Sequence, residues 1–446
     1  MIEVLALGLE SGDPDESPKA AVRSAAHPVG QRLGGLRGAL VLVGWTAAIR
    51  AAYWVFVTPK YVPQSDAGQY HDLATNLASG RGFSLYFPQL AMHPTAFRPP
   101  LYPAVLGFVY WLFGPSIVAG RLLNMTIGVV VVLLAAMVAT RLANVRAGLL
   151  AGFCVACYPP LIANDVTLLS EPLSLGLLLG LVLALSERRV LLGGALCGLL
   201  VLTRPSAQGI ALVALLWVLT QVGWRRSLGF LAVTALVVTP WLVRNWIQLG
   251  SPILVTSNGF NLAAMYSPEA KAEGHFVDPV FNPAFGDYRL LQFDEVAWQR
   301  SLQHLAVGAV TDDPMQVAYV AGRNATHFAE LVPKANYPAE VEDGRNITFR
   351  SWTLPTFYLV TLAGLWGITT RWRNPTTWLL VALVGYSTIT SLVLVAVPRL
   401  RAPFDLMCCI GFGIALDALI RHRQSGSPNR RATIDWFTCR SRLGRR

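Results

Sequence analysis

The sequence predicts an all-helical protein that crosses a membrane several times. Of its 446 residues, 54% are hydrophobic and only 14% are charged, whereas soluble domains carry about 25% charged residues. The hydrophobic residues occur in long runs with short arginine clusters between them, which is typical of multispanning membrane proteins. The same placement of arginines argues against nucleic acid as the partner that the net charge of +11 would otherwise suggest.

The amino-terminal part of the chain sets the predicted orientation. Residues 1–35 are polar and lack the apolar core of a signal peptide, so we expect a disordered cytoplasmic lead. The first span covers residues 36–57. Arginines precede this span, which by the positive-inside rule places the amino terminus in the cytoplasm. Residues 58–117 then form the first extracytoplasmic loop.

The apolar run at 101–114 decides the order of all later spans. It is shorter than the roughly 20 residues that a helix needs to cross a bilayer. If it crossed, Arg141 and Arg146 would lie outside, and the later arginine clusters would fall on the wrong side. If it lies in the membrane interface, both arginines lie inside. We therefore predict interfacial helices in the first outer loop.

The remaining apolar runs then complete a bundle of about ten transmembrane helices with both termini in the cytoplasm. The predicted spans are 118–140, 147–164, 172–186, 227–246, 351–370, 376–397 and 404–420, with a hairpin at 190–222 whose short arms also fit a re-entrant loop. The chain is thereby divided into an amino-terminal transmembrane module (36–246), a small extracytoplasmic cap (247–350), carboxy-terminal transmembrane helices (351–420) and a basic cytoplasmic tail (421–446).

Polar side chains from several outer loops are predicted to gather at the extracytoplasmic face. They are Asp66, Tyr70, His71 and Arg98 from the first loop, Asp165 and Glu171 from the second, and Arg204, Arg244, Arg399 and Arg401 from later turns. Charges at span ends are costly unless they are paired or functional. Arginine suits phosphate because its planar guanidinium donates two parallel hydrogen bonds. The alternative is that Arg399 and Arg401 only reach into lipid headgroups.

Two carboxylates are candidates for acid–base chemistry. Asp66 stands in a polar loop just after the first span and can act as a general base on a hydroxyl group. Ser65 or Asp66 also fits the amino-terminal cap of the helix that follows. Glu171, which precedes Pro172, fits a helix-start acid favoured by the helix dipole. The cysteines form no recognisable metal or disulfide pattern, so no metal site is predicted.

Several motifs occur in a specific order along most of the chain. They are D-x-x-x-Y-x-x-x-A from Asp66, G-R-G-F (80–83), R-P-P-L-Y-P (98–103), L-F-G (112–114), Arg121, S-E-P-L (170–173), L-T-R-P (202–205), T-P-W-L-V-R-N (239–245), G-S-P-I (250–253) and R-L-R-A-P (399–403). In this order the sequence resembles the GT-C glycosyltransferases, the superfamily of the protein O-mannosyltransferases and the lipid A aminoarabinose transferase.

The resemblance implies a multispanning hexosyl- or pentosyltransferase of the plasma membrane with its active site on the extracytoplasmic face. It would move a sugar from a polyprenyl-phosphate donor to a protein, lipid or cell-wall glycan. Asp66 maps onto the catalytic base of the family and Glu171 onto a second-loop acid. The family often has two adjacent acids in the first loop, whereas Ala67 follows Asp66 here. The use of a divalent metal therefore stays open, and no cofactor is expected to be required.

A transporter or lipid flippase for polyprenyl-linked or anionic substrates is the competing class. It predicts ionisable residues within the spans and broken helices in symmetric pairs. Arg50 is the one obvious charge inside a predicted span, and no internal repeat is visible. The polar residues gather at one face instead, which favours the enzyme, for which we expect inversion at the sugar with Asp66 as the base.

Overall fold

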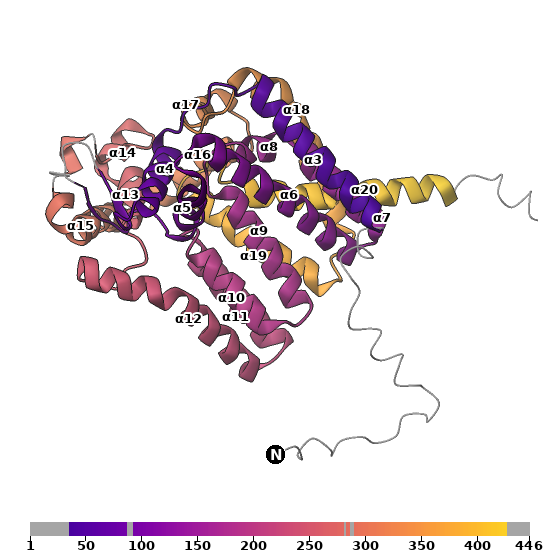
Figure 1. Cartoon of the computed structure of the whole chain (residues 1–446), viewed down its shortest axis with the longest axis horizontal. Helices are drawn as coiled ribbons and strands as arrows, with labels where there is room; N and C mark the ends of the chain where they lie inside the picture. Colours follow the sequence, from indigo (N-terminus) through magenta and orange to yellow (C-terminus); the bar gives the residue numbers. More distant parts are fainter. Residues whose placement is uncertain (1–34, 87–91, 281, 286–289, 426–446) are drawn as a thin grey trace, which may run out of the picture.

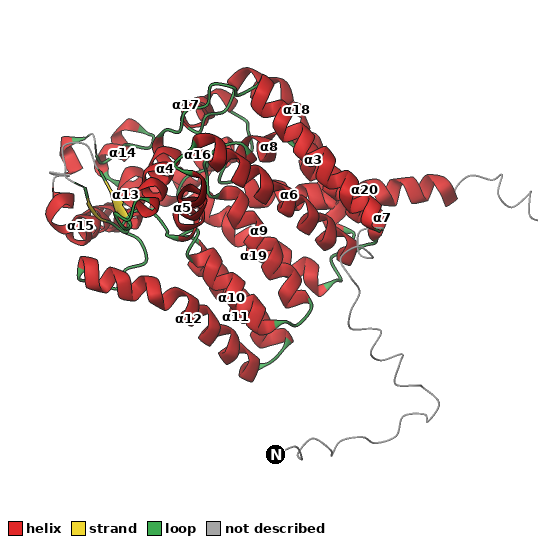
Figure 2. Ribbon diagram, viewed as in Figure 1, coloured by secondary structure: helices red, strands yellow, loops and turns green. Residues whose placement is uncertain are grey.

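The computed structural model describes residues 35–86, 92–280, 282–285 and 290–425, and it is built almost entirely of helices (Figure 1). The described strands, β1 (Ser84–Leu85) and β2 (His93–Pro94), form one short antiparallel pair (Figure 2). The predicted polar lead and most of the predicted basic tail lie outside the described residues. The predicted all-helical class is thus confirmed for the described part of the chain.

Within the described residues, five helices are long and apolar enough to cross a membrane. They are α3 (Leu36–Phe56), α6 (Ile117–Leu142), α12 (Trp224–Leu249), α19 (Pro375–Val393) and α20 (Ala402–Ser425). A sixth candidate is the pair α7 (Val145–Cys157) and α8 (Pro159–Asp165), which is bent by 65°. The bend falls where Pro159 and Pro160 follow α7, because proline cannot donate the backbone hydrogen bond that would continue a helix.

The predicted count of about ten spans is not confirmed. The segments α9 (Glu171–Ser186), α10 (Val190–Val201) and α11 (Ala207–Gln221) are helices of 12 to 16 residues. At about 1.5 Å per residue, such helices fall short of the roughly 30 Å of hydrocarbon in a bilayer. The helix α18 (Ile347–Thr369) is long enough but less apolar than the five spans.

Glycines let two of the long helices approach closely. A Cβ atom placed on Gly364 of α18 would lie 2.2 Å from the carbonyl oxygen of Cys408 on α20, and one on Gly411 would lie 2.0 Å from that of Gly364. Backbone contact of this kind is common between membrane helices, because apolar side chains gain little by leaving lipid for one another. It fixes the position of α20 and of the turn that precedes it.

The first outer loop folds into two packed helices, α4 (Ser65–Ala78) and α5 (Leu101–Phe113). The rings of Tyr70 and Tyr102 meet edge to face with centroids 5.0 Å apart. Gly107 of α5 lies against Ala74 of α4, since an added Cβ would be 3.2 Å from the Ala74 carbonyl oxygen. At 13 residues α5 is too short to span a bilayer. The contacts hold the first turn of α4 at a fixed place.

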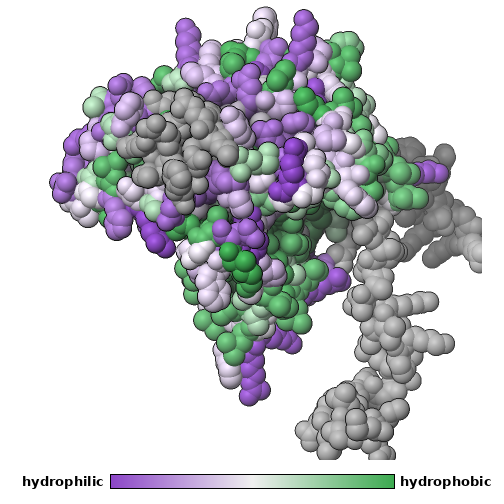
Figure 3. All heavy atoms as spheres, turned by 60° about the vertical axis from the view of Figure 1, so that its left-hand side comes forward, coloured by the Kyte–Doolittle hydropathy of each residue, from purple (hydrophilic) through white to green (hydrophobic). Residues whose placement is uncertain are grey.

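The region from 250 to 346 forms further helices around this loop. They are α13 (Ser257–Tyr266), α14 (Pro268–Glu273), η1 (Pro283–Phe285), α15 (Leu290–Asp312), α16 (Met315–Phe328), η2 (Pro333–Asn336) and α17 (Tyr337–Glu342). In Figure 1, α13, α14 and α15 lie near α4, at the opposite end of the molecule from the free end of α20. Figure 3 shows mainly hydrophilic side chains over the upper part of the molecule and mainly hydrophobic ones over the lower part. Exposed apolar side chains of α12, such as Leu236, Trp246 and Ile247, belong to a surface suited to lipid.

Candidate active site

Asp66 lies in the first turn of α4 and pairs with two arginines from distant parts of the chain. Its Oδ1 accepts a hydrogen bond from Nη2 of Arg98, and its Oδ2 accepts one from Nη2 of Arg399 at 2.5 Å. The side chain of Asp66 is 20% exposed, those of Arg98 and Arg399 17% and 16%. The group is therefore shielded but still reachable from outside. Neither Ser65 nor Asp66 caps α4, whose N-cap is Gln64 with no side-chain bond.

The residue before Asp66 has a rare backbone conformation. Ser65 has φ 46°, in the left-handed region that residues other than glycine seldom adopt. Such conformations cost about 1–3 kcal/mol each and occur often at functional sites. Here it starts the turn that carries Asp66 toward the two arginines.

Arg399 joins Asp66 to a second carboxylate that the sequence analysis did not single out. Its Nη1 lies 3.1 Å from Oδ1 of Asp343, in the turn after α17. Asp343 stands in a polar region with many acids, and no motif or spacing marked it. Arg399 thus bridges two carboxylates that are far apart in the sequence.

The two carboxylates have different proton affinities. Burial opposes the ionisation of Asp66, but the charges of Arg399 and Arg98 outweigh it and hold its pKa well below the ordinary value. Burial raises the pKa of Asp343 to about 6, because the opposing charges of Arg399 and Arg345 do not compensate for it fully. At neutral pH both groups are ionised, and Asp66 is the weaker base.

Glu171 and Arg204 form a second ion pair beside the first. Nη1 of Arg204 lies 3.2 Å from Oε1 of Glu171, whose Oε2 is buried without a hydrogen-bond partner among the described residues. The hydroxyl of Tyr70 lies 3.3 Å from that of Ser170, which joins α4 to the start of α9. The charge of Arg204 also lowers the pKa of Asp66. The two ion pairs thus act on one another. We call Asp66, Arg98, Glu171, Arg204, Asp343 and Arg399 the Asp66 cluster.

Three other predicted site residues have partners outside this cluster. Nδ1 of His71 lies 2.8 Å from the hydroxyl of Tyr110, against α5. Nη1 of Arg244 donates to the carbonyl of Thr95 and its Nη2 to that of Phe83, so this arginine holds the loop around β1 and β2. Oδ2 of Asp165 accepts from Arg50 at 2.8 Å within the helices.

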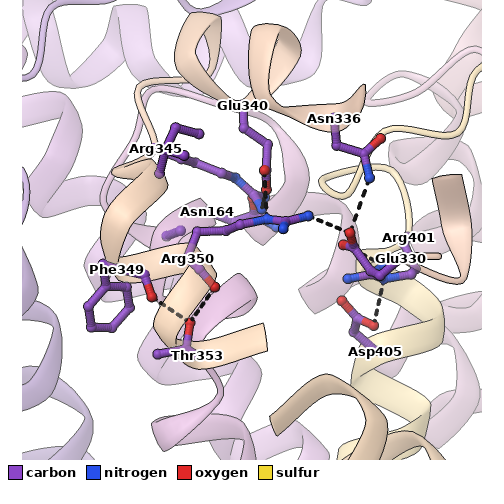
Figure 4. Close-up of polar contacts among 12 residues, drawn as sticks. Asn164, Glu330, Asn336, Glu340, Arg345, Phe349, Arg350, Thr353, Arg401 and Asp405 are labelled. Carbon is purple, nitrogen blue, oxygen red and sulfur yellow. Dashed lines mark hydrogen bonds and ion pairs between the residues drawn. The ribbon is translucent and has the colours of Figure 1, made fainter. Parts of the chain in front are cut away.

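Arg401 belongs to a separate buried network of charged side chains, shown in Figure 4. Its Nη1 donates to Glu330 at 2.9 Å and its Nε to Asp405 at 3.0 Å. Nε of Arg350 lies 2.7 Å from Glu340. The network ties the start of α18 and α20 to the α16–α17 region. Arg399 and Arg401, only two residues apart, therefore serve different groups.

No group of three histidine, cysteine, aspartate or glutamate side chains is placed to hold a metal ion in the part of the chain that the structure describes. In the Asp66 cluster each carboxylate faces an arginine. Guanidinium groups therefore carry the positive charge that the described site offers to an anion.

The fold can be compared with known proteins. The sequence matches no protein-family model and no curated protein significantly. The structure is similar to the oligosaccharyltransferase AglB from Archaeoglobus fulgidus, in complex with an inhibitory peptide and a dolichol-phosphate. The TM-score is 0.50 at 16% identity over 88% of this chain and 52% of that one. The apo form of the oligosaccharyltransferase from the same organism gives 0.50 at 15% identity over 86% and 51%.

The chain has the fold of the GT-C membrane glycosyltransferases. This is the fold that the sequence resemblance predicted. The chain spans about half the length of the archaeal oligosaccharyltransferases that it matches. A weaker likeness, with a TM-score of 0.42 and 14% identity over 86% of this chain and 78% of that one, is to ArnT from Cupriavidus metallidurans bound to undecaprenyl phosphate.

Proposed function

We propose that the protein is a membrane glycosyltransferase that moves a sugar from a polyprenyl-phosphate carrier to an acceptor on the extracytoplasmic side of the plasma membrane. The observation that carries this proposal is the position of Asp66 between Arg98 and Arg399 in a GT-C fold. A carboxylate can take the proton of a hydroxyl nucleophile, and the arginines beside it can bind a phosphate leaving group. The dolichol-phosphate held by the archaeal enzyme is a polyprenyl phosphate and supports this donor class.

The proposed reaction is a single displacement with inversion. Asp66 takes the proton of the acceptor hydroxyl, whose oxygen forms a bond to the anomeric carbon. The bond between that carbon and the phosphate oxygen breaks, and its electron pair stays with the phosphate. Arg98, Arg204 and Arg399 stabilise the charge that develops there, and such fixed donors usually supply the largest part of catalysis. The acceptor is a protein, lipid or glycan hydroxyl.

The predicted residues take different roles in this proposal. Asp66, Arg98, Arg204 and Arg399 act on the substrate, and Glu171 holds Arg204. Arg244 and Arg401 support the surrounding loops through the contacts described above. Tyr70 orients α4 through Ser170. His71 stays a predicted substrate contact.

The pairing of the intramembrane charge favours the enzyme over the transporter. Arg50 was the one feature of the spans that fitted a transport pathway. It is fully buried, and its guanidinium is bound by Asp165 and by the carbonyl of Ala156. Removing one partner of such a buried ion pair is strongly destabilising. The presence of Arg50 is therefore explained by its structural role, without a transport pathway.

The test uses the full-length protein in lipid nanodiscs with a panel of synthetic polyprenyl-phosphate monosaccharides. Release of polyprenyl phosphate is followed by mass spectrometry, with and without a cell-envelope extract as the source of acceptor. We expect release from at least one donor and its loss in Asp66→Asn, with the thermal stability retained. Full activity in a folded Asp66→Asn variant would show that Asp66 is not the base.

A further inference from the structure

The pairing of Asp66 poses a chemical problem for its role as a base. Both of its oxygens accept hydrogen bonds from guanidinium groups, one from Arg98 and one from Arg399. A carboxylate held in this way has little affinity for a proton, because protonation would break two charge-assisted bonds. Its hydrogen bonds to Arg98 and Arg399 must therefore be broken before Asp66 can accept a proton.

We propose that Arg98 and Arg399 form the binding site for the phosphate of the donor, that Asp66 occupies this site in the free protein, and that the phosphate displaces it. Displacement leaves Asp66 next to the phosphate and free to accept the proton of the acceptor hydroxyl. The inference rests on the proposed function and adds to it the place of the phosphate and the order of events.

The geometry of Arg399 supports this site. In a guanidinium group, Nε–H and one Nη–H₂ point along the same edge and together match two oxygens of a phosphate or carboxylate. Asp66 takes only Nη2 of Arg399, and the Nε is buried without an acceptor among the described residues. A phosphate at this edge would satisfy both donors. Asp66 therefore satisfies only one of the two donors on this edge of Arg399.

Arg98 offers the same kind of edge. Its Nε donates to Oε1 of the neutral Gln69 at 2.6 Å, and its Nη2 donates to Asp66. The ring of Phe97 lies under the guanidinium, whose carbon is 5.1 Å from the ring centroid. This stacking and the bond to Gln69 keep Arg98 in place when Asp66 leaves.

Asp343 is the positioning residue that keeps Arg399 in place. It binds Nη1, on the side of the guanidinium away from the Nε edge, at 3.1 Å. Asp343 is in turn carried by a turn between Glu340 and Arg345, which belong to the buried network of Figure 4. Arg399 can therefore exchange Asp66 for a phosphate without moving.

The balance of charge agrees with an exchange rather than a simple addition. The Asp66 cluster holds three carboxylates and three arginines, so it has no spare positive charge for a phosphodiester. Transfer converts the phosphodiester, with one negative charge, into a phosphate monoester with two, while Asp66 becomes neutral by taking the proton. The summed charge of phosphate and Asp66 stays constant. The phosphate can thus replace Asp66 as the anionic partner of the arginines.

The experiment measures binding of undecaprenyl phosphate to the full-length protein in nanodiscs by native mass spectrometry. Asp66→Asn removes the competitor and should tighten binding by about tenfold or more, since charge-assisted hydrogen bonds contribute about 1.5–3 kcal/mol. The gain should vanish in an Arg399→Gln background. Asp66→Ala removes the same carboxylate and replaces Asp66→Asn if that variant does not fold.

Asp343→Asn is the matched control, because it removes an equal charge from the same arginine at another nitrogen. We expect it not to tighten binding, because Arg399 loses the partner that positions it, whereas plain loss of negative charge would tighten binding in both variants alike. Unchanged binding in Asp66→Asn, or equal tightening in both, would overturn the displacement while leaving the proposed function intact. If the wild-type protein binds no undecaprenyl phosphate, the proposed function itself fails.

Discussion

The replacement of Arg399 by glutamine tests the site most directly. Arg399 is the one side chain that contacts both Asp66 and Asp343, and its Nε–H has no acceptor in the described structure. Glutamine removes the charge and the planar fork together. Asp66 keeps Arg98 as a partner, whereas Asp343 keeps only the more distant charge of Arg345. The loss should therefore fall on the transition state more than on the fold.

The expected magnitude follows from the contacts that are lost. Removal of one preorganised donor to a developing negative charge lowers turnover by about 10²–10³, or roughly 2.7–4 kcal/mol. Arg399→Lys keeps the charge but not the fork, and we expect it to retain about a tenth of the activity, the change that roughly 1.4 kcal/mol produces. Removing one partner of a fully buried ion pair costs about 3–5 kcal/mol of stability. Because Arg399 is partly exposed and Asp343 can take up a proton, we expect a smaller cost of about 1–2 kcal/mol.

The assay is the release of undecaprenyl phosphate from the active sugar donor in nanodiscs, with thermal unfolding measured on the same samples. Arg146→Gln is the matched control, because Arg146 is 45% exposed, pairs only loosely with Asp417 at 3.9 Å, and lies on the predicted cytoplasmic side. It should keep full activity. If Arg399→Gln turns over within threefold of the wild-type rate, or if both variants lose activity equally, Arg399 does not stabilise the leaving phosphate.

Three further predictions concern proton affinity, helix packing and the buried network. Because the pKa of Asp343 is raised to about 6, the folded protein binds this proton more tightly than the unfolded chain does. The contribution of Asp343 to stability should therefore fall as the pH rises from about 4 to 6, by at most about 3 kcal/mol. Over this range the free energy of unfolding of Asp343→Asn, measured relative to wild type, should rise with pH, and a constant difference would contradict the assignment. Gly411→Ala places a Cβ against the Gly364 carbonyl and should lower the unfolding temperature clearly, whereas Gly385→Ala, with nothing within 4 Å, should leave it unchanged or raise it. Arg401→Gln leaves Glu330 and Asp405 without their shared partner, which should lower the free energy of unfolding by about 3–5 kcal/mol. The yield of folded protein should therefore fall far more than in Arg98→Gln. Equal yields of the two variants would show that Arg401 does not stabilise the fold.

The sequence by itself determined the class of the protein. In lipid, the backbone N–H and C=O groups of a long apolar run have no water to bond to, and a helix pairs these groups with one another. The long apolar runs therefore predict helices. The arginine clusters and the length of the 101–114 run separated a short helix from a span, and α5 has the length that this argument requires. The ordered motifs pointed to the GT-C fold, which the structural comparison shows. The number of spans is not confirmed, because several of the apolar runs that were counted as crossings form helices shorter than a bilayer requires.

The tertiary structure alone decided which charged residues meet. Asp66 and Arg399 are 333 residues apart, and Arg50 and Asp165 are 115 apart. Their pairing depends on which helix ends converge, which no local pattern records. For the same reason Arg399 and Arg401, which look equivalent in the sequence, enter different groups. Asp343 is recognised as part of the site only in the structure, where the turn after α17 places it against Nη1 of Arg399. Sequence fixes which residues can ionise, and packing fixes what each of them faces.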